Sequence, residues 1–152
     1  MPSYTKYSVN VYEDGAKYWF LNDKLHRTDG PAVERAYGTK EWYLNGERHR
    51  TDGPAIEYAN GLKLWYLNGK LHRTDGPAVE RANGTKEWYL NDKRHREDGP
   101  AVEYADGSKR WYLNGEEMTQ EEHARRTQPA KELSVAEIEK LLGYKIKIVK
   151  DS

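Results

Sequence analysis

The sequence predicts a mainly β protein: an elongated antiparallel β-repeat of five 23-residue hairpin units, closed by a small C-terminal helix plus strand cap. Two observations lead to this fold class. The phrase HRTDGPAVE occurs at residues 26–34 and 72–80, and with one substitution each at 49–57 and 95–103. All five tryptophans recur at one constant interval, at Trp19, Trp42, Trp65, Trp88 and Trp111. A fixed period of about 20–50 residues marks a repeat architecture in which each unit buries its apolar face against the next.

Each unit contains two turn signals. The first is a small or polar residue followed by Gly, at residues 14–15, 37–38, 60–61, 83–84 and 106–107. The second is Asn followed by Gly or Asp, at residues 22–23, 45–46, 68–69, 91–92 and 114–115. Such pairs supply the positive φ angles of tight hairpins, and the Asp-Gly-Pro that closes a unit pre-sets a further turn. Short strands should therefore run between the turns.

The segment KEWYL at residues 40–44 predicts how the core is built. Side chains alternate between the two faces of a continuous strand, which puts Lys40, Trp42 and Leu44 on one face. The Trp and Leu positions never vary among the copies, whereas the residue before Trp is Tyr, Glu, Leu, Glu and Arg in turn. We therefore expect a buried tryptophan face, with the central tryptophans as anchors. The opposite face should be half-exposed and carry Tyr43, Tyr66, Tyr89 and Tyr112.

The C-terminal part of the chain departs from the repeat. We expect a five-unit β-repeat domain at residues 1–117 and a C-terminal helical cap ending in a β-strand at 118–152. TQEE at 119–122 and SVAE at 134–137 are capping-box sequences, each of which predicts the start of a helix; the second helix should end at Gly143. RRTQPAKEL at 125–133 has the composition of a linker, and YKIKIVK at 144–150 alternates like a strand. The second helix and this strand should cover the open end of the sheet.

Composition narrows the class of protein. Val, Ile, Leu and Phe make up only 24 of 152 residues, while 5 Trp and 12 Tyr replace the missing aliphatic area, so we expect a thin-cored, very polar fold. The 25 basic and 25 acidic residues cancel, so nothing attracts the chain in bulk to nucleic acid or lipid. The absence of cysteine fits a reducing compartment. No apolar run is long enough for a membrane span, and the N-terminus lacks the pattern of a signal peptide, which predicts a cytoplasmic protein.

The repeat resembles a known family. With 23-residue units and hairpins built on Trp, Tyr and Gly, it resembles MORN repeats, and more closely a MORN-like type written WYLNGxxHRxDGPAxE that is found in tailed phages and giant viruses. The resemblance covers residues 8–115, which is most of the chain. The extra glycines of ordinary MORN repeats are absent, so their membrane-associated roles are not carried over. The resemblance implies a viral protein that acts in the host cytoplasm by binding.

The repeated His-Arg-x-Asp-Gly segment has a structural interpretation. Asp can cap the amides of its own turn. The arginine can pair with a glutamate of the next strand, at Glu34, Glu57, Glu80 or Glu103. A cross-strand pair of this kind contributes roughly 0.2–1 kcal/mol. This accounts for Asp, Arg and Glu in every copy, but leaves the histidine unexplained.

The functional interpretation begins with that histidine. Four stacked His-Arg pairs, flanked by tyrosines, would form a polar stripe able to bind a protein surface or a phosphate or carboxylate group. The candidate binding residues are His26, Arg27, His49, Arg50, His72, Arg73, His95, Arg96, Tyr43, Tyr66 and Tyr89. We expect the arginines to be structural and the histidines to face outward. The alternative is that each His packs on a neighbouring Trp or bonds a backbone carbonyl across the turn.

These residues favour a non-enzymatic binding protein that occupies a host protein, such as a defence or regulatory component. The alternative is a sponge that sequesters an anionic small molecule or signal nucleotide. We expect no cofactor, no metal site, no membrane partner and no nucleic acid partner, and leave self-association open. Catalysis has little support because no nucleophile stands beside a base and no Gly-rich phosphate loop is present. His123, outside the repeat register, should be solvated on a charged helix.

Overall fold

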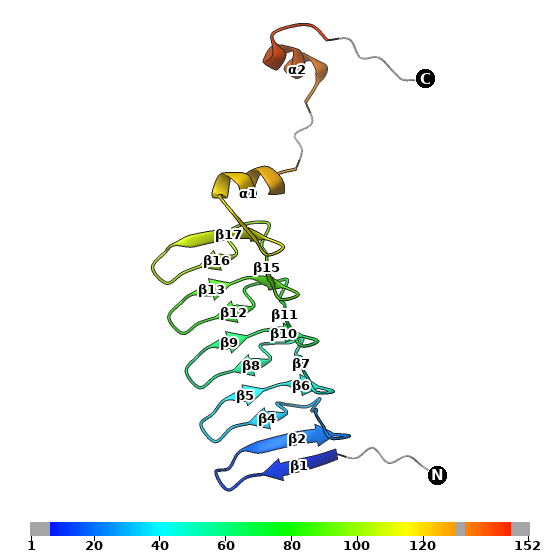
Figure 1. The fold of residues 1–152 in the computed structure, drawn as a ribbon, viewed down its shortest axis with the longest axis vertical. Helices are drawn as coiled ribbons and strands as arrows, with labels where there is room; N and C mark the ends of the chain where they lie inside the picture. The colour runs from blue at the N-terminus through cyan, green and yellow to red at the C-terminus, as the bar shows by residue number, and fades with distance from the viewer. Residues whose placement is uncertain (1–6, 130–132, 147–152) are drawn as a thin grey trace, which may run out of the picture.

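The computed structural model describes residues 7–129 and 133–146 (Figure 1). The strands are β1 (Tyr7–Val11), β2 (Lys17–Leu21), β3 (Lys24–Leu25), β4 (Val33–Glu34), β5 (Lys40–Glu41), β6 (Tyr43–Leu44), β7 (Glu47–Arg48), β8 (Ile56–Glu57), β9 (Lys63–Leu64), β10 (Tyr66–Leu67), β11 (Lys70–Leu71), β12 (Val79–Glu80), β13 (Lys86–Glu87), β14 (Tyr89–Leu90), β15 (Lys93–Arg94), β16 (Val102–Glu103), β17 (Lys109–Leu113) and β18 (Glu116–Met118). Two helices follow, α1 (Gln120–Thr127) and α2 (Val135–Leu142).

The predicted fold class is confirmed: a long antiparallel sheet of repeated hairpins, with two short helices near the C-terminus. A 12-stranded sheet runs in the order β1-β2-β4-β5-β8-β9-β12-β13-β16-β17-β18, with β3 paired to β2. Each middle unit gives its first hairpin to this sheet, and its second hairpin forms a separate strand pair: β6-β7, β10-β11 or β14-β15. Both sets of hairpins stack along the long axis (Figure 1). We number the units 1 to 5, with units 2, 3 and 4 at residues 31–53, 54–76 and 77–99.

The turns have the backbone geometry that their dipeptides predict. In the first turn of each unit the glycine takes φ between +85° and +92°, as at Gly38. In the second turn both residues have positive φ, for example +53° at Asn45 and +88° at Gly46. Asn, Asp and Gly tolerate this region far better than other residues, so the spacing of the turns is fixed by the sequence.

The strand predicted over residues 40–44 is interrupted at its tryptophan. The Trp42 amide donates to the Ala55 carbonyl in the main sheet at 2.8 Å, while the Trp42 carbonyl accepts from the His49 amide in the second hairpin at 3.1 Å. The tryptophan is therefore the corner between the two hairpins of a unit, and its side chain is half-buried. The expectation that Trp42 and its equivalents are fully buried was wrong: all five tryptophans are half-buried, and Trp88 packs against the buried residues Ala101, Val102 and Tyr112. Alternation restarts at this corner.

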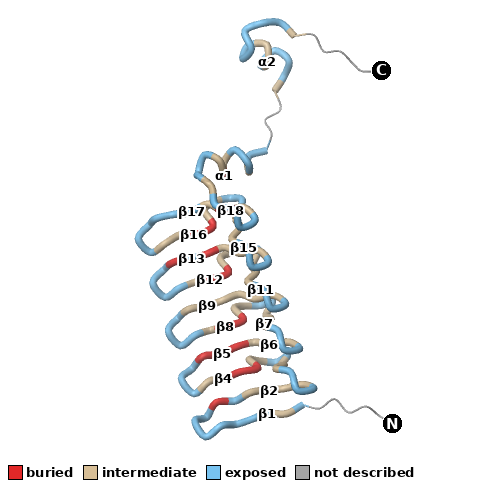
Figure 2. Tube along the Cα trace, in the orientation of Figure 1, coloured by how far each residue is buried: buried red, intermediate tan, exposed pale blue. Residues whose placement is uncertain are grey.

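The core is instead a narrow row along the sheet (Figure 2). Register pairs Tyr18 with Val33, Val33 with Glu41, Glu41 with Ile56 and Ile56 with Leu64, and the row continues in the same way to Arg110. The Val and Ile members are 0–4% exposed, as are the alanines before them. The variable residue before Trp, expected on the half-exposed face, lies in this row; Glu41 and Glu87 are only 5% exposed.

A ladder of alternating charge lies one residue away on the opposite face. Directly opposed Cα partners run Lys17, Glu34, Lys40, Glu57, Lys63, Glu80, Lys86, Glu103 and Lys109. Each glutamate therefore has a lysine on both sides. Opposite charges at facing positions contribute roughly 0.2–1 kcal/mol per pair. The direct ion pairs of these four glutamates are with arginines, Arg27, Arg50, Arg73 and Arg96.

The first predicted helix is present as α1. The Thr119 hydroxyl accepts from the Glu122 amide at its start, and Arg125 and Arg126, assigned to a linker from the sequence, belong to its last turn. Contrary to expectation, His123 is buried, at 4% exposure, and its Nε2 lies 2.6 Å from the Arg96 carbonyl oxygen. Helix α1 contacts β17 and thus covers the C-terminal end of the sheet.

Helix α2 also forms where predicted, with a reciprocal capping box between Ser134 and Glu137 and a left-handed Gly143 at its end. It buries none of its residues, so the covering role expected of it is taken by α1. The strand predicted at 144–150 is absent from residues 144–146, and its remainder lies outside the described residues. In the part of the chain that the structure describes, no helix combines the length and apolar character needed to cross a membrane.

Candidate binding surface

Four equivalent segments, which we call the HRxDG turns, follow the second hairpins at residues 26–30, 49–53, 72–76 and 95–99. In the second of them, Arg50 Nε donates to Asp52 at 2.8 Å, and Nη1 donates to the Pro54 carbonyl at 3.1 Å and to Glu57 at 3.0 Å. Its guanidinium carbon lies 4.0 Å from the ring centroid of Trp42. The other three turns repeat these contacts, so the predicted Arg–Glu pairing is confirmed: Arg27 with Glu34, Arg73 with Glu80, and Arg96 with Glu103.

The glycine of each HRxDG turn is required by this arginine and not by a special φ angle. A Cβ built on Gly53 would lie 2.9 Å from Cζ of Arg50, and Gly76 has the same relation to Arg73. The guanidinium is thus held between the tryptophan ring and the glycine backbone. The Asp, predicted to cap its own turn, is also the partner of the arginine Nε, and a hydrogen bond with its own backbone helps to lower its pKa.

The histidines link neighbouring units. The Asn68 backbone amide donates to His49 Nδ1 at 3.2 Å, and the other three histidines accept from the Asn of the next unit at 3.0–3.3 Å. Nδ1 of His26, His49 and His72 also lies 2.8–3.1 Å from the side-chain Oδ1 of the same asparagine. These contacts to an asparagine of the next unit match neither predicted arrangement. They give the histidine a structural role that joins successive units.

Three hollows lie between successive HRxDG turns. The first, of about 480 Å³, is lined by Arg27, Thr28, Asp29, Gly30, Trp42, Leu44, His49, Arg50, Thr51 and Asp52. The second and third, of about 670 and 630 Å³, are lined by the equivalent residues one and two units further on. Four turns and three hollows form one continuous surface, which we call the HR stripe. His49, His72 and His95 line it with all four arginines; His26 lines none of the hollows.

The outermost charge on the HR stripe is negative. The four arginine side chains are only 20–22% exposed, whereas the aspartates paired with them are 80–84% exposed. A hydrogen bond from Arg50 and the charge of that residue hold the pKa of Asp52 below its usual range, and the same applies to Asp29, Asp75 and Asp98 beside their own arginines. These carboxylates are ionised at neutral pH, and only one oxygen of each accepts from the arginine Nε.

The candidate tyrosines are not part of the HR stripe. Tyr43 donates from its hydroxyl to Glu41 at 3.0 Å, and Tyr89 donates to Glu87 at 3.1 Å. The Arg48 guanidinium carbon lies 5.8 Å from the Tyr43 ring centroid and 5.5 Å from that of Tyr66. Burial raises the pKa of all three hydroxyls. None of the three tyrosines lines a hollow, so the structure separates the two groups of candidate residues.

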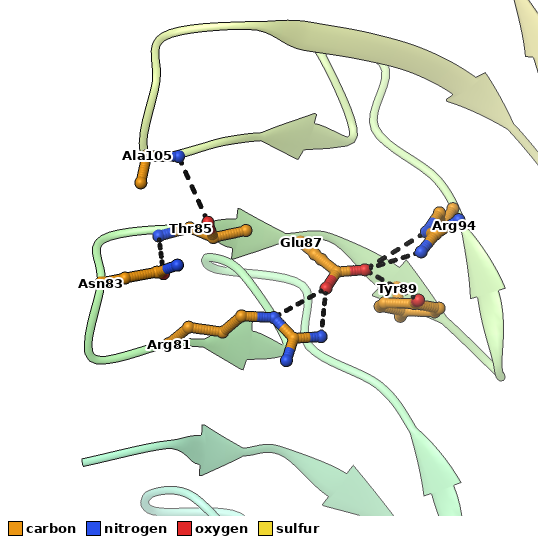
Figure 3. A network of polar contacts seen from close by, with 7 residues as sticks. All are labelled: Arg81, Asn83, Thr85, Glu87, Tyr89, Arg94 and Ala105. Carbon is orange, nitrogen blue, oxygen red and sulfur yellow. Dashed lines mark hydrogen bonds and ion pairs between the residues drawn. The ribbon is translucent and has the colours of Figure 1, made fainter. Parts of the chain in front are cut away.

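Buried glutamates in units 2 and 4 are the feature that the sequence interpretation missed (Figure 3). Glu87 accepts from Arg81 at 2.9 Å, from Arg94 at 2.9 Å and from the Tyr89 hydroxyl. Although burial raises the pKa of Glu87, these hydrogen bonds outweigh burial and lower it. Glu41 receives the equivalent bonds from Arg35 and Tyr43, with Arg48 at 3.6 Å. A carboxylate can be buried here because three donors surround it.

A signal for these networks is present in the sequence. The residues six before and seven after Glu41 are both arginines, and so are those around Glu87. Unit 3 has Tyr58, Leu64 and Leu71 at the same three positions. Units 2 and 4 therefore share one set of residues at these three positions and unit 3 has another, although the turns and tryptophans repeat in every unit.

Among residues 7–129 and 133–146, no three His, Asp or Glu side chains gather in a way that could hold a metal ion. No protein-family model matches the chain, and no curated protein matches it. The MORN-like resemblance therefore stays a prediction, and the function rests on the geometry of the HR stripe.

Proposed function

We propose that this is a non-enzymatic binding protein that holds a protein partner along its HR stripe. The observation that carries the proposal is the row of three hollows lined by residues at equivalent positions, identical in type except that Glu97 replaces a threonine in the third. A row of equivalent sites suits a partner that extends along the sheet. It does not provide the single asymmetric arrangement of nucleophile, base and charge stabiliser that catalysis needs.

The side chains that line the hollows support this proposal. Each hollow is lined by a tryptophan, a leucine, at least one threonine and two ionised aspartates, and Glu97 takes the place of the second threonine in the third hollow. Surfaces that combine aromatic and apolar side chains with polar ones are typical of protein-binding sites. Because arginine pairing fixes the rim before a partner arrives, little side-chain entropy is lost on binding.

The alternative, a sponge for an anionic molecule, receives less support from the charges. Each arginine already bonds an aspartate and a glutamate, as Arg50 bonds Asp52 and Glu57, so an incoming phosphate would compete with two carboxylates. The exposed aspartates would also repel it. The resemblance to phage and giant-virus repeats supports a host protein as the partner and the host cytoplasm as the location.

Affinity capture with matched variants tests this function. We expect wild-type protein to retain a host protein from lysate, and Asp52→Asn/Asp75→Asn to retain much less of it. Asp14→Asn/Asp106→Asn is the control, because these residues lie on first-hairpin turns outside the HR stripe. Equal retention by all three proteins would show that the stripe is not the binding surface.

A thermal-shift panel of nucleotides tests the alternative. A nucleotide present at about 100 times its dissociation constant should add about 2.7 kcal/mol of stability. We expect no shift from any nucleotide. A shift that Asp52→Asn/Asp75→Asn leaves intact or enlarges would favour the sponge.

A further inference from the structure

The spacing of the hollows is set by the sheet. Each of units 2 to 4 adds two strands to it. Neighbouring strands lie about 4.7–4.9 Å apart, so successive HRxDG turns advance by about 9.4–9.8 Å. The three hollows therefore recur at this constant interval along one face of the molecule.

Among regular backbones, polyproline II matches this spacing. It repeats every three residues, or about 9.3 Å. Side chains on one face of an extended strand recur every ~6.6–6.8 Å, and an α-helix presents a given face about every 5.4 Å. Over the two intervals between three hollows, polyproline II stays within about 1 Å of register.

The hydrogen-bond donors and the aromatic side chains that line the hollows also suit a polyproline II backbone. Polyproline II has no internal hydrogen bonds, so its carbonyls need external donors. Thr28 and Thr51 line the first hollow and their hydroxyls offer donors, whereas the Arg27 guanidinium already bonds Asp29, Pro31 and Glu34. Proline rings and aliphatic side-chain stems pack well on aromatic surfaces such as Trp42, as they do in other polyproline-binding grooves.

The charge of the HR stripe determines the side chains of the partner. Asp29, Asp52, Asp75 and Asp98 are each exposed by 80–84% and each bond their arginine through Oδ1. In the described residues, no donor reaches the Oδ2 of any of them. A basic side chain entering each hollow would meet two such carboxylates, one from each turn.

From spacing, donors and charge together, we infer that the HR stripe binds a proline-rich, basic segment in the polyproline II conformation, with one Arg or Lys per three residues seated in each hollow. This inference rests on the proposed function and names the chemistry of its partner. Three triplets fill the three hollows.

Synthetic peptides with three charged side chains each test the register. The first has three Pro-Pro-Arg triplets, the second three Pro-Pro-Pro-Arg quartets, and the third three Pro-Pro-Glu triplets. Because linked contacts lose avidity when geometry prevents them from binding together, we expect the first to bind at least about tenfold more tightly than the second in calorimetry at low salt. The acidic peptide should not bind.

The aspartate variants locate the site. Asp52→Asn/Asp75→Asn should weaken the Pro-Pro-Arg peptide about tenfold, as expected when two rim charges facing a basic ligand are lost. Asp14→Asn/Asp106→Asn should leave its affinity unchanged. Circular dichroism checks that each variant keeps the wild-type spectrum.

Equal affinity for triplets and quartets would overturn the inference, since it would mean charge attraction without register. Tighter binding of the acidic peptide would also overturn it. If the aspartate variant loses the captured host protein and no peptide binds, the inference fails while the proposed function stands. If the aspartate substitutions change neither the capture of the host protein nor the binding of the peptide, both the inference and the proposed function fail.

Discussion

In units 2 and 4 the residue before the tryptophan is a buried glutamate, whereas in unit 3 it is a half-buried leucine. The backbone, turns and charge ladder are the same in all three. Glu41 and Glu87 carry their own donors, two arginines and a tyrosine each, while Leu64 is accompanied by Tyr58 and Leu71. The comparison shows that the position before the tryptophan does not require an apolar side chain. It accepts a glutamate where neighbouring side chains donate hydrogen bonds to the carboxylate, and a leucine where they are apolar or aromatic.

The largest effect should come from separating Glu87 from its donors. Arg81→Tyr/Arg94→Leu gives unit 4 the neighbours of unit 3 but leaves a buried carboxylate, 6% exposed, without either cation. We expect the free energy of unfolding, measured by urea titration, to fall by about 3–5 kcal/mol. Adding Glu87→Leu completes the residue set of unit 3 and should restore most of the loss. A double variant as stable as wild type would contradict the comparison.

Adding a methyl group at the HRxDG glycine should lower the free energy of unfolding by the same amount in both kinds of unit. Gly53→Ala in unit 2 and Gly76→Ala in unit 3 would each place a Cβ 2.9 Å from an arginine Cζ. Displacing that guanidinium from its tryptophan and its carboxylates should lower the free energy of unfolding by about 1–3 kcal/mol. Gly84→Ala cannot serve as a control, because φ there is +92°, a conformation that alanine rarely adopts. Ala82→Gly, at an exposed position, is the control for an exchange between alanine and glycine.

Acid should reduce the contribution that the buried glutamate of unit 4 makes to the free energy of unfolding. The pKa of Glu87 is lower in the folded protein than its usual value, so its contribution to stability is complete above the pKa of the unfolded chain and is lost as the pH falls through the folded pKa. The Arg81→Tyr/Glu87→Leu/Arg94→Leu variant lacks this group. We expect the free energy of unfolding of wild type to fall relative to that of the variant as the pH falls below about 4. The aspartates of the HR stripe titrate in both proteins and cancel. Parallel pH profiles would exclude this account.

The smallest effect on the free energy of unfolding should come from substitutions in the ladder of alternating lysines and glutamates. Lys63→Ala in unit 3 and Lys86→Ala in unit 4 each remove a lysine opposed to two glutamates, Glu57 and Glu80 or Glu80 and Glu103. Each should cost roughly 0.2–1 kcal/mol and be reduced by salt. A larger loss in unit 4 would mean that the buried network extends across the sheet to the ladder.

The sequence predicts the repeat, its turns and its antiparallel hairpins because these depend on local chemistry. Asn-Gly needs no tertiary partner to favour a hairpin, and a constant interval between tryptophans is visible without a structure. The buried row could not be derived from alternation, because alternation assumes one continuous strand and the chain turns its corner at Trp42. The arginines spaced around Glu41 were the available evidence that a glutamate could be buried.

The HR stripe was predicted in part. Arg50 pairs with Glu57 as the sequence suggests, because the two are close in the chain and a strand connects them. The histidine was not assigned correctly, since its partner is an asparagine 19 residues away in the next unit, which it contacts through the backbone amide and the side-chain Oδ1. An asparagine stands 19 residues after each of the four repeat histidines, and this spacing was the available signal. The tyrosines were grouped with the stripe because the corner at the tryptophan, which separates them, was not foreseen.

The Lys–Glu ladder also has an evolutionary consequence. Since each of units 2 to 5 contributes one glutamate and one lysine in the same order, deleting or duplicating one whole middle unit by recombination would rejoin a lysine to a glutamate of the same kind. Such an event would shorten or lengthen the HR stripe by one hollow without creating a new residue. An event that spans two units would also preserve the alternation of the core. The length of the binding surface is thus a property that selection can adjust one unit at a time.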